Sequence, residues 1–566
     1  MNKKRLVCAL LALALGALFH CGDGDPWPGG DGDSDGDSDG DGDGDGDGDC
    51  FSANECPPGM YCNEFGRCVW PPGGDDSLDA GVDGDAGDAE PYVPPEVEQE
   101  FGPPSSGHRY VYVALPDLDS VARVDSESLD VTSLTVGDRP GQLATAPGQD
   151  LAVVINEGSD SVSILRATGE EDRLVTLPTL PMLNRLVVGP LGQFAIAYFE
   201  LESPEAEDVG SFQDVALIRL VEGEEAFYGV SVGFRPSEVI FSADESAAYV
   251  ITEDGVSILD LNDVEDGFVA PTVPVRVDPF TEAIPDEVVL SPEGFHVFAR
   301  WADRTQVRSV DLVTGEVVDT ELGGVPTDID VTQTGDQLIA VVRETSEILI
   351  LSIPADIGHP DALRRIDCAP LVVGSAVVSP DGSQALVFTN ALNQKAIALL
   401  DLDTAEMDVA MLRKGIRTVA LSPDGTTAII LHNRIPGEPA ATDDFETQLD
   451  HRYGFSMLSL DSLFAKLQIT EADPGAFTFL PDSSAAYIIV ADPTVDLRQV
   501  ATADLETFIV TTTSMGSHPL ELGNVPGTGR VYVSQEHAIG RISFIDVETG
   551  EVRTVTGFQL NSGITE

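Results

Sequence analysis

The sequence predicts an all-β protein: a β-propeller of repeated four-stranded blades, preceded by a disordered acidic tether and a small disulfide-rich module. Two observations predict the propeller. From residue 107 onward the chain repeats with a period of 40 to 58 residues, and each unit holds four short β-rich runs separated by turn residues. Helical periodicity is nearly absent. Each unit is therefore expected to form one blade.

The repeat unit has a fixed order of signals. Its first run ends in a turn such as 379–382 (Ser-Pro-Asp-Gly), its third run closes on Asp, and its fourth leads through Gly and Pro into the next unit. The second runs give ten units, which begin near Tyr110, Leu151, Phe194, Ala248, His296, Leu338, Ala385, Ala428, Ala486 and Val531. Because no linker interrupts the repeats, one large ring is favoured over two smaller ones. The first strand of the first unit is expected either to end at 106–107 or to be supplied by 560–566.

Charge limits the partners of the folded part. Residues 107–566 hold 73 acidic and 26 basic residues, a net charge of −47. Binding to nucleic acid or to an anionic membrane surface depends on clustered Lys and Arg. The sequence therefore predicts no nucleic-acid partner and favours cationic partners.

The N-terminus has the features of a secretory signal. Residues 1–20 combine a basic start with an apolar run that is shorter than a membrane span. Residues 18–21 (Leu-Phe-His-Cys) resemble the lipobox of bacterial lipoproteins, although Phe19 and His20 replace the small residues usual there. The resemblance implies that Cys21 carries acyl chains that anchor the protein to a membrane. Because Gly22 replaces the Asp of an inner-membrane retention signal, an outer-membrane or cell-surface location is expected. The alternative is an ordinary signal peptide.

Four cysteines, Cys50, Cys56, Cys62 and Cys68, follow one another at even spacing. In an exported chain they predict two disulfides, with three pairings left open, while Cys368 is expected to be a buried free thiol. A zinc site is the alternative, but Cys-x-x-Cys pairs are missing. The segment 55–62 resembles small EGF-like or Dickkopf-type cysteine-rich modules, which serve as spacers or protein-binding knobs.

The composition divides the chain into five parts. The signal peptide covers 1–20, the lipidated Cys with a Gly/Asp-rich tether 21–49, the cysteine-rich module 50–70, a Pro-rich acidic linker 71–106 and the propeller 107–566. The tether holds twelve Asp residues and repels itself, so an extended chain is expected. Residues 31–37 resemble the start of a calcium loop but lack its Glu at position twelve, which predicts weak multi-site association with Ca²⁺. No other cofactor is expected.

The repeats resemble the YVTN-type, lactonase-like β-propeller proteins, many of which are bacterial surface or periplasmic proteins. The resemblance covers roughly 107–566 and implies the architecture only, because propellers host unrelated activities. Lactonase-like relatives hydrolyse ester rings with a few polar residues at the mouth of the ring. No motif in this chain matches those residues, and no nucleophile elbow, phosphate loop, haem attachment or paired-His metal motif occurs. No catalytic residue is therefore assigned.

An Asp closes the third run in seven of the ten units: Asp125, Asp260, Asp311, Asp401, Asp461, Asp504 and Asp546. A catalytic carboxylate is needed once or twice in a ring, whereas a turn-forming side chain is needed at every hairpin. We interpret these residues as structural.

The binding face is predicted from strand direction. In an antiparallel blade, the connection from the second to the third strand and the connection to the next blade emerge on one face. Long insertions at 201–211 and 434–452 and the long stretch 263–285 are all of this kind. The candidate binding residues there are Arg139, Arg235, His518, Glu205, Glu207, Asp208 and His451. The candidate ligands for a metal such as Ca²⁺ are Asp443, Asp444, Glu446 and Asp450.

Two functions follow as hypotheses. The first is a lipid-anchored surface protein without enzymatic activity that displays the propeller for a protein or small-ligand partner on one face. The second is a lactonase-like propeller hydrolase acting on a small ester or lactone. The sequence favours the first.

Overall fold

The computed structural model describes residues 99–168, 172–201, 210–263, 265–391 and 394–558, together with the backbone of two short strands nearer the N-terminus. These strands, β1 (Tyr61–Cys62) and β2 (Cys68–Val69), form an antiparallel pair in which Cys62 lies opposite Cys68. They belong to a separate compact unit, residues 21–96. In the described residues, no helix has the length and apolarity needed to cross a membrane.

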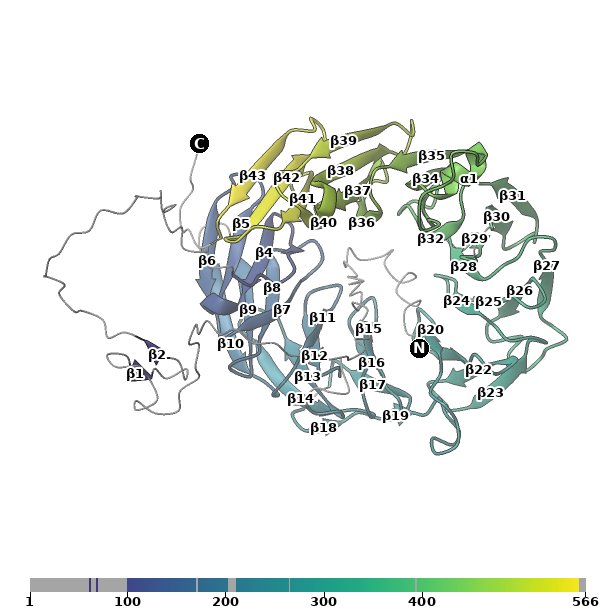
Figure 1. The fold of residues 1–566 in the computed structure, drawn as a ribbon. Coiled ribbons are helices and arrows are strands. Elements are labelled where there is room, and N and C mark those ends of the chain that lie inside the picture. The colour runs from purple at the N-terminus through teal and green to yellow at the C-terminus, as the bar shows by residue number, and fades with distance from the viewer. Residues whose placement is uncertain are drawn as a thin grey trace, which may run out of the picture. The chain divides into compact units, whose positions relative to one another are not determined.

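The remaining strands form ten sheets that follow one another around a ring (Figure 1). Blade 1 contains β3 (Ser105–Ser106), β4 (Tyr110–Leu115), β5 (Ser120–Asp125) and β6 (Val131–Thr135). Blade 2 contains β7 (Pro140–Thr145), β8 (Leu151–Asn156), β9 (Ser161–Ala167) and β10 (Asp172–Pro178). Blade 3 contains β11 (Arg185–Val188), β12 (Phe194–Tyr198), β13 (Asp214–Arg219), β14 (Ala226–Ser231) and, as a fifth strand, β18 (Phe268–Val269).

The middle of the ring repeats the pattern. Blade 4 contains β15 (Glu238–Phe241), β16 (Ala247–Ile251), β17 (Val256–Asp260) and β19 (Thr272–Val273). Blade 5 contains β20 (Glu287–Leu290), β21 (His296–Arg300), β22 (Gln306–Asp311) and β23 (Val317–Glu321). Blade 6 contains β24 (Asp328–Val331), β25 (Gln337–Val342), β26 (Glu347–Ser352) and β27 (Arg364–Asp367). Blade 7 contains β28 (Ser375–Val378), β29 (Gln384–Phe388), β30 (Ala396–Asp401) and β31 (Met407–Met411).

The last blades complete the ring. Blade 8 contains β32 (Ile416–Leu421), β33 (Thr427–His432), β34 (Tyr453–Ser459) and β35 (Ala465–Thr470). Blade 9 contains β36 (Pro474–Phe479), β37 (Ala485–Asp492), β38 (Leu497–Asp504) and β39 (Val510–Ser514), and blade 10 contains β40 (Pro519–Val525), β41 (Arg530–Gln535), β42 (Arg541–Asp546) and β43 (Val552–Thr556). In the part of the chain that the structure describes, the helical elements are α1 (Phe445–Asp450) and two 3-10 turns, η1 (Pro116–Leu118) and η2 (Pro493–Val495).

The prediction of one large ring with ten four-stranded blades is confirmed. Each predicted second strand begins within one residue of its observed start, from β4 at Tyr110 to β41 at Arg530. The first strand of each blade lies toward the centre of the ring and the fourth toward the outside, as Figure 1 shows. Consecutive strands pair with one another in each blade, so the four strands follow in chain order from the centre of the ring outward.

The hydrophobic core consists of ten clusters, one between each pair of neighbouring blades. In one of them, Val111 and Leu115 of blade 1 pack with Tyr532 and Phe544 of blade 10. Because both faces of every blade are buried in this way, the second strands are predominantly apolar, as in β4 (YVYVAL) and β12 (FAIAY). Closure of the ring is therefore as well packed as any other interface.

Blade 1 takes its first strand from the N-terminal side. Strand β3 pairs with β4 and lies between β40 and β7, the first strands of its two neighbours. The Ser106 hydroxyl donates to the Asn524 carbonyl at 2.6 Å, and the Tyr532 hydroxyl donates to the Pro104 carbonyl at 3.1 Å. Of the two expected sources, the segment near residues 106–107 supplies the strand, and 560–566 lie outside the described residues.

The repeated turns have the expected chemistry. In the 379–382 turn, Gly382 has a φ of 72° and its N–H donates to the Ser379 carbonyl at 2.8 Å, while the Asp381 carboxylate accepts from the Ser379 hydroxyl at 2.6 Å. The third-strand Asp residues accept backbone N–H groups two or three residues later; Asp504 accepts from Glu506 at 3.1 Å and from Thr507 at 2.7 Å. This confirms their structural interpretation for six of the seven.

Asp461 is the exception. Strand β34 ends at Ser459, so Asp461 lies two residues beyond the position that the other six occupy. The Ser459 hydroxyl oxygen accepts there instead, from the Ser462 N–H at 3.4 Å and the Ser462 hydroxyl at 2.9 Å. The prediction for Asp461 was wrong because Ser also makes this turn.

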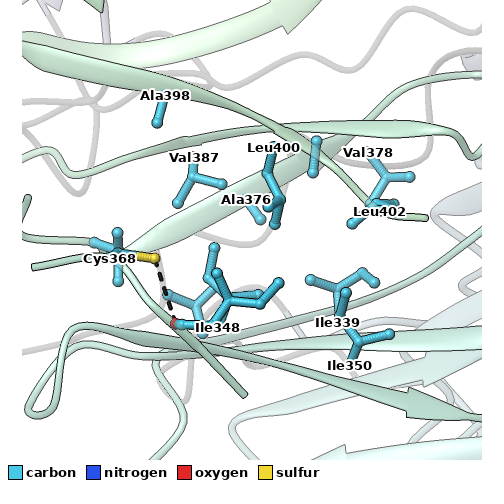
Figure 2. Packing of buried hydrophobic residues seen from close by; sticks show 14 of the residues in the cluster. Ile339, Ile348, Ile350, Cys368, Ala376, Val378, Val387, Ala398, Leu400 and Leu402 are labelled. Carbon is cyan, nitrogen blue, oxygen red and sulfur yellow. Dashed lines mark hydrogen bonds between the residues drawn. The ribbon is translucent and has the colours of Figure 1, made fainter. Parts of the chain in front are cut away.

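Cys368 packs in the core between blades 6 and 7 (Figure 2). Its thiol is free and fully buried, and its sulfur lies 3.7 Å from the Ile366 carbonyl oxygen. Burial raises the pKa of the Cys368 thiol to about 11. The expectation of a buried free thiol is confirmed, and the high pKa makes this cysteine unreactive in the folded protein.

Candidate binding face

We call the face of the ring that carries the insertions of blades 3 and 8 the insertion face. It comprises the connections from the second to the third strand of each blade and the connections between blades. The former are residues 116–119, 157–160, 199–213, 252–255, 301–305, 343–346, 389–395, 433–452, 493–496 and 536–540, and the latter are 136–139, 179–184, 232–237, 274–286, 322–327, 368–374, 412–415, 471–473 and 515–518. The opposite face, with the other two sets of connections, is the turn face, and it also has long connections, at 261–271 and 353–363. The expectation that 263–285 lies wholly on the insertion face was wrong: β19 is the fourth strand of blade 4, so only 274–286 connects blades 4 and 5.

Hydrogen bonds tie the two kinds of connection together. The Arg139 carbonyl accepts from the Glu157 N–H at 2.9 Å, and the His518 carbonyl accepts from the Glu536 N–H at 2.8 Å. Connections between blades also have an unusual backbone: Arg139 and Arg235 have φ angles of 47° and 54°, and Met182 has a φ of 59°. Left-handed backbone at such residues is held only by a well-defined surrounding structure. The insertion face is therefore a stiff surface.

The predicted binding residues on this face do not form one site. Arg139, Arg235 and His518 precede blades 2, 4 and 10, and among the described residues no hydrogen bond or ion pair joins any two of them. The Arg139 guanidinium lies 4.0 Å from Glu100, both exposed, whereas Arg235 pairs with Glu253 at 2.6 Å. Glu205, Glu207 and Asp208 lie outside the described residues.

The blade 8 insertion folds as a unit around α1. Asp444 caps the helix by accepting the Thr447 N–H at 2.8 Å, and Asp443 accepts the Ala440 N–H at 2.7 Å. Glu446 and Asp450 pair with Lys395, at 3.9 and 2.9 Å. Each candidate metal ligand thus has a partner within the protein, and the described residues contain no group of three His, Cys, Asp or Glu side chains placed to hold a metal ion.

Lys414 fixes this insertion to the ring. Its side chain is fully buried, and its ammonium donates to the carbonyls of Leu449 at 2.8 Å and Asp450 at 3.3 Å, at the C-terminal end of α1. Burial lowers the pKa of Lys414 to about 8. The Nδ1–H of His451 donates to the Gly437 carbonyl at 3.0 Å, so His451 also belongs to the insertion's own structure. A lysine at a helix C-terminus satisfies carbonyls that the helix leaves unpaired.

The sequence analysis missed a group of acidic side chains on the inner strands. Glu287 of β20 and Asp328 and Asp330 of β24 lie at the junction of blades 5, 6 and 7. The Asp328 carboxylate accepts the Ala376 N–H of blade 7 at 2.8 Å, and Glu287 pairs with Arg300. Burial raises the pKa of Asp328 to about 8 and that of Asp330 to about 7. The sequence signal that could have revealed this group is the presence of acidic residues within strand segments that are otherwise apolar.

These acids have a structural role in the wide ring. The first strand of each blade has one edge without a paired strand, so its N–H groups need other acceptors. Carboxylates from the preceding blade supply them, as Asp328 does for Ala376. Carbonyl groups near these edges are satisfied by side-chain donors from the preceding blade: the Thr327 hydroxyl donates to the Gly374 carbonyl at 2.8 Å. The cluster therefore needs no catalytic explanation.

Several other sequence predictions cannot be placed. Cys21, Cys50 and Cys56 lie outside the described residues, and for Cys62 and Cys68 only the backbone is described. The lipid anchor and the two disulfides therefore stay predictions.

Comparisons with known proteins identify no family. No family model and no curated protein matches the chain. Solved structures with similar folds include the hydrazine synthase of Kuenenia stuttgartiensis (15% identity over 57% of this chain and 95% of that chain, TM-score 0.33). A eukaryotic initiation factor (12%, 74% and 96%, TM-score 0.47) and the dihydro-heme d1 dehydrogenase NirN in complex with DHE (14%, 73% and 74%, TM-score 0.40) are also similar. At these identities and TM-scores the activities of those proteins do not carry over to this chain.

Proposed function

We propose that the chain is an exported, lipid-anchored protein that displays its propeller as a non-enzymatic binding scaffold, with the insertion face turned to its partner. A single observation carries the proposal. Of the 21 large apolar side chains exposed on the described residues, ten belong to the insertion face and five to the turn face. The ten are Leu118, Met182, Phe234, Val277, Phe280, Ile284, Ile435, Phe445, Val495 and Ile539.

Exposed apolar side chains on stiff loops support binding. These ten residues are between 36% and 97% exposed to water, and a partner that covers their apolar surface gains about 25 cal/mol per Å². Because the loops are already tied by hydrogen bonds, little conformational entropy is lost on binding. A concentration of exposed apolar side chains on one face of a protein is a feature expected of an interaction surface.

The proposal that the insertion face binds the partner is tested with two matched variants of the full chain. One replaces Leu118, Val495 and Ile539 by Ser, on consecutive blades of the insertion face; the other replaces Leu191, Phe464 and Ile509 by Ser on the turn face. Envelope proteins retained by the wild type should be retained by the turn-face variant and lost by the insertion-face variant. Equal retention by both variants would contradict the proposed orientation.

The anchor and the absence of catalysis have separate tests. Replacing Cys21 by Ser should abolish labelling with radioactive palmitate and release the protein from the membrane fraction; unchanged label and fractionation would contradict the anchor. A panel of lactones, assayed with and without Ca²⁺, should show no turnover above the uncatalysed rate. Reproducible turnover would favour the lactonase-like alternative.

A further inference from the structure

The connection between blades 4 and 5, residues 274–286, forms one wall of a groove. The groove has a volume of about 720 Å³ and runs between the outer strands of the two blades. Thr272, Pro274, Val277 and Pro279 lie on one side, and Gly315 and Val317 lie on the other. We call it the blade 4–5 groove. It exists because β19 has only two residues and leaves the outer edge of blade 4 short.

Arg276 holds this connection to blade 4. Its Nε and Nη2 atoms donate to the Glu253 carbonyl at 3.0 and 2.7 Å. Its Nη1 atom donates to the carbonyls of Pro279 at 3.2 Å and Glu282 at 3.3 Å. One guanidinium thus closes the loop on itself and ties it to the neighbouring connection.

Glu282 holds the same connection to blade 5. Its carboxylate accepts from the Val277 N–H at 2.9 Å, from Arg308 at 2.8 Å and from Arg304 at 3.4 Å. The hydrogen bond from Arg308 is the main reason that the pKa of Glu282 falls to about 2. The Trp301 indole donates to the Ala283 carbonyl at 2.8 Å. The loop is therefore fixed at both ends and in its middle.

The fixed loop presents apolar side chains to solvent. Phe280 is 97% exposed and Val277 is 68% exposed, and beyond the opposite wall Val313 is 76% exposed. An aromatic side chain that is held on a rigid loop and not covered by its own protein is a typical binding anchor. Phe280 contributes almost no buried area to the fold, so nearly its whole ring is available to a partner.

The charge around the groove is negative. Asp254 lines it, and Asp278 and Glu316 are exposed on its two sides. Arg276, the only cation among the lining residues, has its donors engaged by backbone carbonyls. The N-terminal segments 22–49 and 71–100 contain 22 acids and no bases, and the propeller itself carries −47. Neither this chain's own acidic segments nor a second copy fits such a groove.

We propose that the blade 4–5 groove binds an extended, basic segment of a partner protein, with Phe280 and Val277 packing against its apolar side chains and the surrounding acids facing its Lys or Arg residues. The inference rests on the proposed function and names one docking surface for it. The mode resembles peptide recognition in which apolar anchors give affinity and charge gives orientation.

The test uses random twelve-residue peptides displayed on phage and selected on the immobilised full chain. Selected peptides are then synthesised, and their dissociation constants are measured by fluorescence anisotropy for the wild type, Phe280→Ser, Val277→Ser and the control Phe295→Ser. Phe295 is also an exposed aromatic side chain of blade 5 (56%) but lies on the turn face. Unchanged melting temperatures for all variants are expected, since each side chain is exposed.

The groove predicts a specific pattern. Selected peptides should combine Lys or Arg with apolar residues. Their affinity should fall by at least about tenfold for the Phe280→Ser and Val277→Ser variants and stay unchanged for Phe295→Ser. Their affinity for the wild type should also fall as the salt concentration rises. Peptides without basic residues, or peptides unaffected by Phe280→Ser, would overturn the proposal, as would a selection without binders. If binding instead depends on Leu118, Val495 and Ile539, the scaffold function stands and only this groove is wrong.

Discussion

Phe101 and Phe558 meet edge to face, with ring centroids 5.5 Å apart and an interplanar angle of 87°. Phe101 precedes the first strand of blade 1, and Phe558 follows the last strand of blade 10. The contact therefore joins the two ends of the described propeller beside the cluster that blades 1 and 10 share. Edge-to-face pairs are a favourable geometry for aromatic rings.

Replacing Phe558 by Ala should destabilise the closed ring. The side chain is 3% exposed, so its removal leaves a cavity and is expected to cost about 3–5 kcal/mol. We expect a lower thermal unfolding midpoint and faster hydrogen exchange in β43. The exposed Phe295→Ala variant of blade 5 is the control and should change neither. An equal loss in both variants would contradict a specific role of the closing contact.

Shortening 434–452 to a Gly-Ser turn should destabilise the protein. The deletion removes the carbonyls that Lys414 binds and leaves its ammonium buried without acceptors, which costs about 3–5 kcal/mol. Adding Lys414→Met should restore much of the thermal midpoint, because Met fills the site without a charge. A deletion that leaves the midpoint unchanged would contradict this role of Lys414.

The contribution of Asp328 and Asp330 to stability should fall as pH rises from about 4 to 8. Burial raises the pKa of Asp328 to about 8 and of Asp330 to about 7, so the folded chain keeps protons that the unfolded chain releases near pH 4. Glu287 raises the pKa of both, and Arg300 opposes it at Asp328. The Asp330→Asn variant should flatten the dependence and be more stable than wild type at pH 8 in denaturant titrations. If the stability of Asp330→Asn depends on pH in parallel with that of the wild type, the prediction is wrong. The control is Asp303→Asn, which replaces an exposed carboxylate.

The turn carboxylates should matter only where they accept hydrogen bonds. Asp504→Ala removes two backbone bonds and one from the Thr507 hydroxyl at 2.8 Å, and it is expected to cost about 1 kcal/mol. Amide exchange in residues 505–509 should accelerate accordingly. Asp461→Ala in the neighbouring blade should have no such effect, because Ser459 makes that turn. Equal effects of the two substitutions would refute the assignment.

Thiol counting should find one free cysteine. We expect Cys50, Cys56, Cys62 and Cys68 to be oxidised and Cys21 to be acylated, which leaves Cys368. Because Cys368 is fully buried with a raised pKa, iodoacetamide should label it only after unfolding. Mass spectrometry of the unreduced protein measures both. Three or more labelled thiols would contradict the two disulfides.

The sequence by itself determined the blades. Strand positions and turns follow from neighbouring residues, through apolar runs, Ser-Pro-Asp-Gly turns and Asp at hairpin ends, so they could be read locally. The second strands were placed within one residue, and ten units gave ten blades. The buried state of Cys368 also followed, since no second cysteine occurs within the repeats.

Only the tertiary structure decided what depends on residues far apart in the chain. Ring closure by β3 joins residues more than 400 positions apart, and Lys414 meets α1 only once blade 8 has folded. The raised pKa values of Asp328 and Asp330 arise from packing between blades, which no local pattern records. Arg139, Arg235 and His518 occupy equivalent positions in the repeat, but a ring places equivalent positions on different blades. For that reason the repeat pattern could predict which face of the propeller carries these residues. It could not predict the groove beside Phe280, because that groove forms only where blades 4 and 5 pack together.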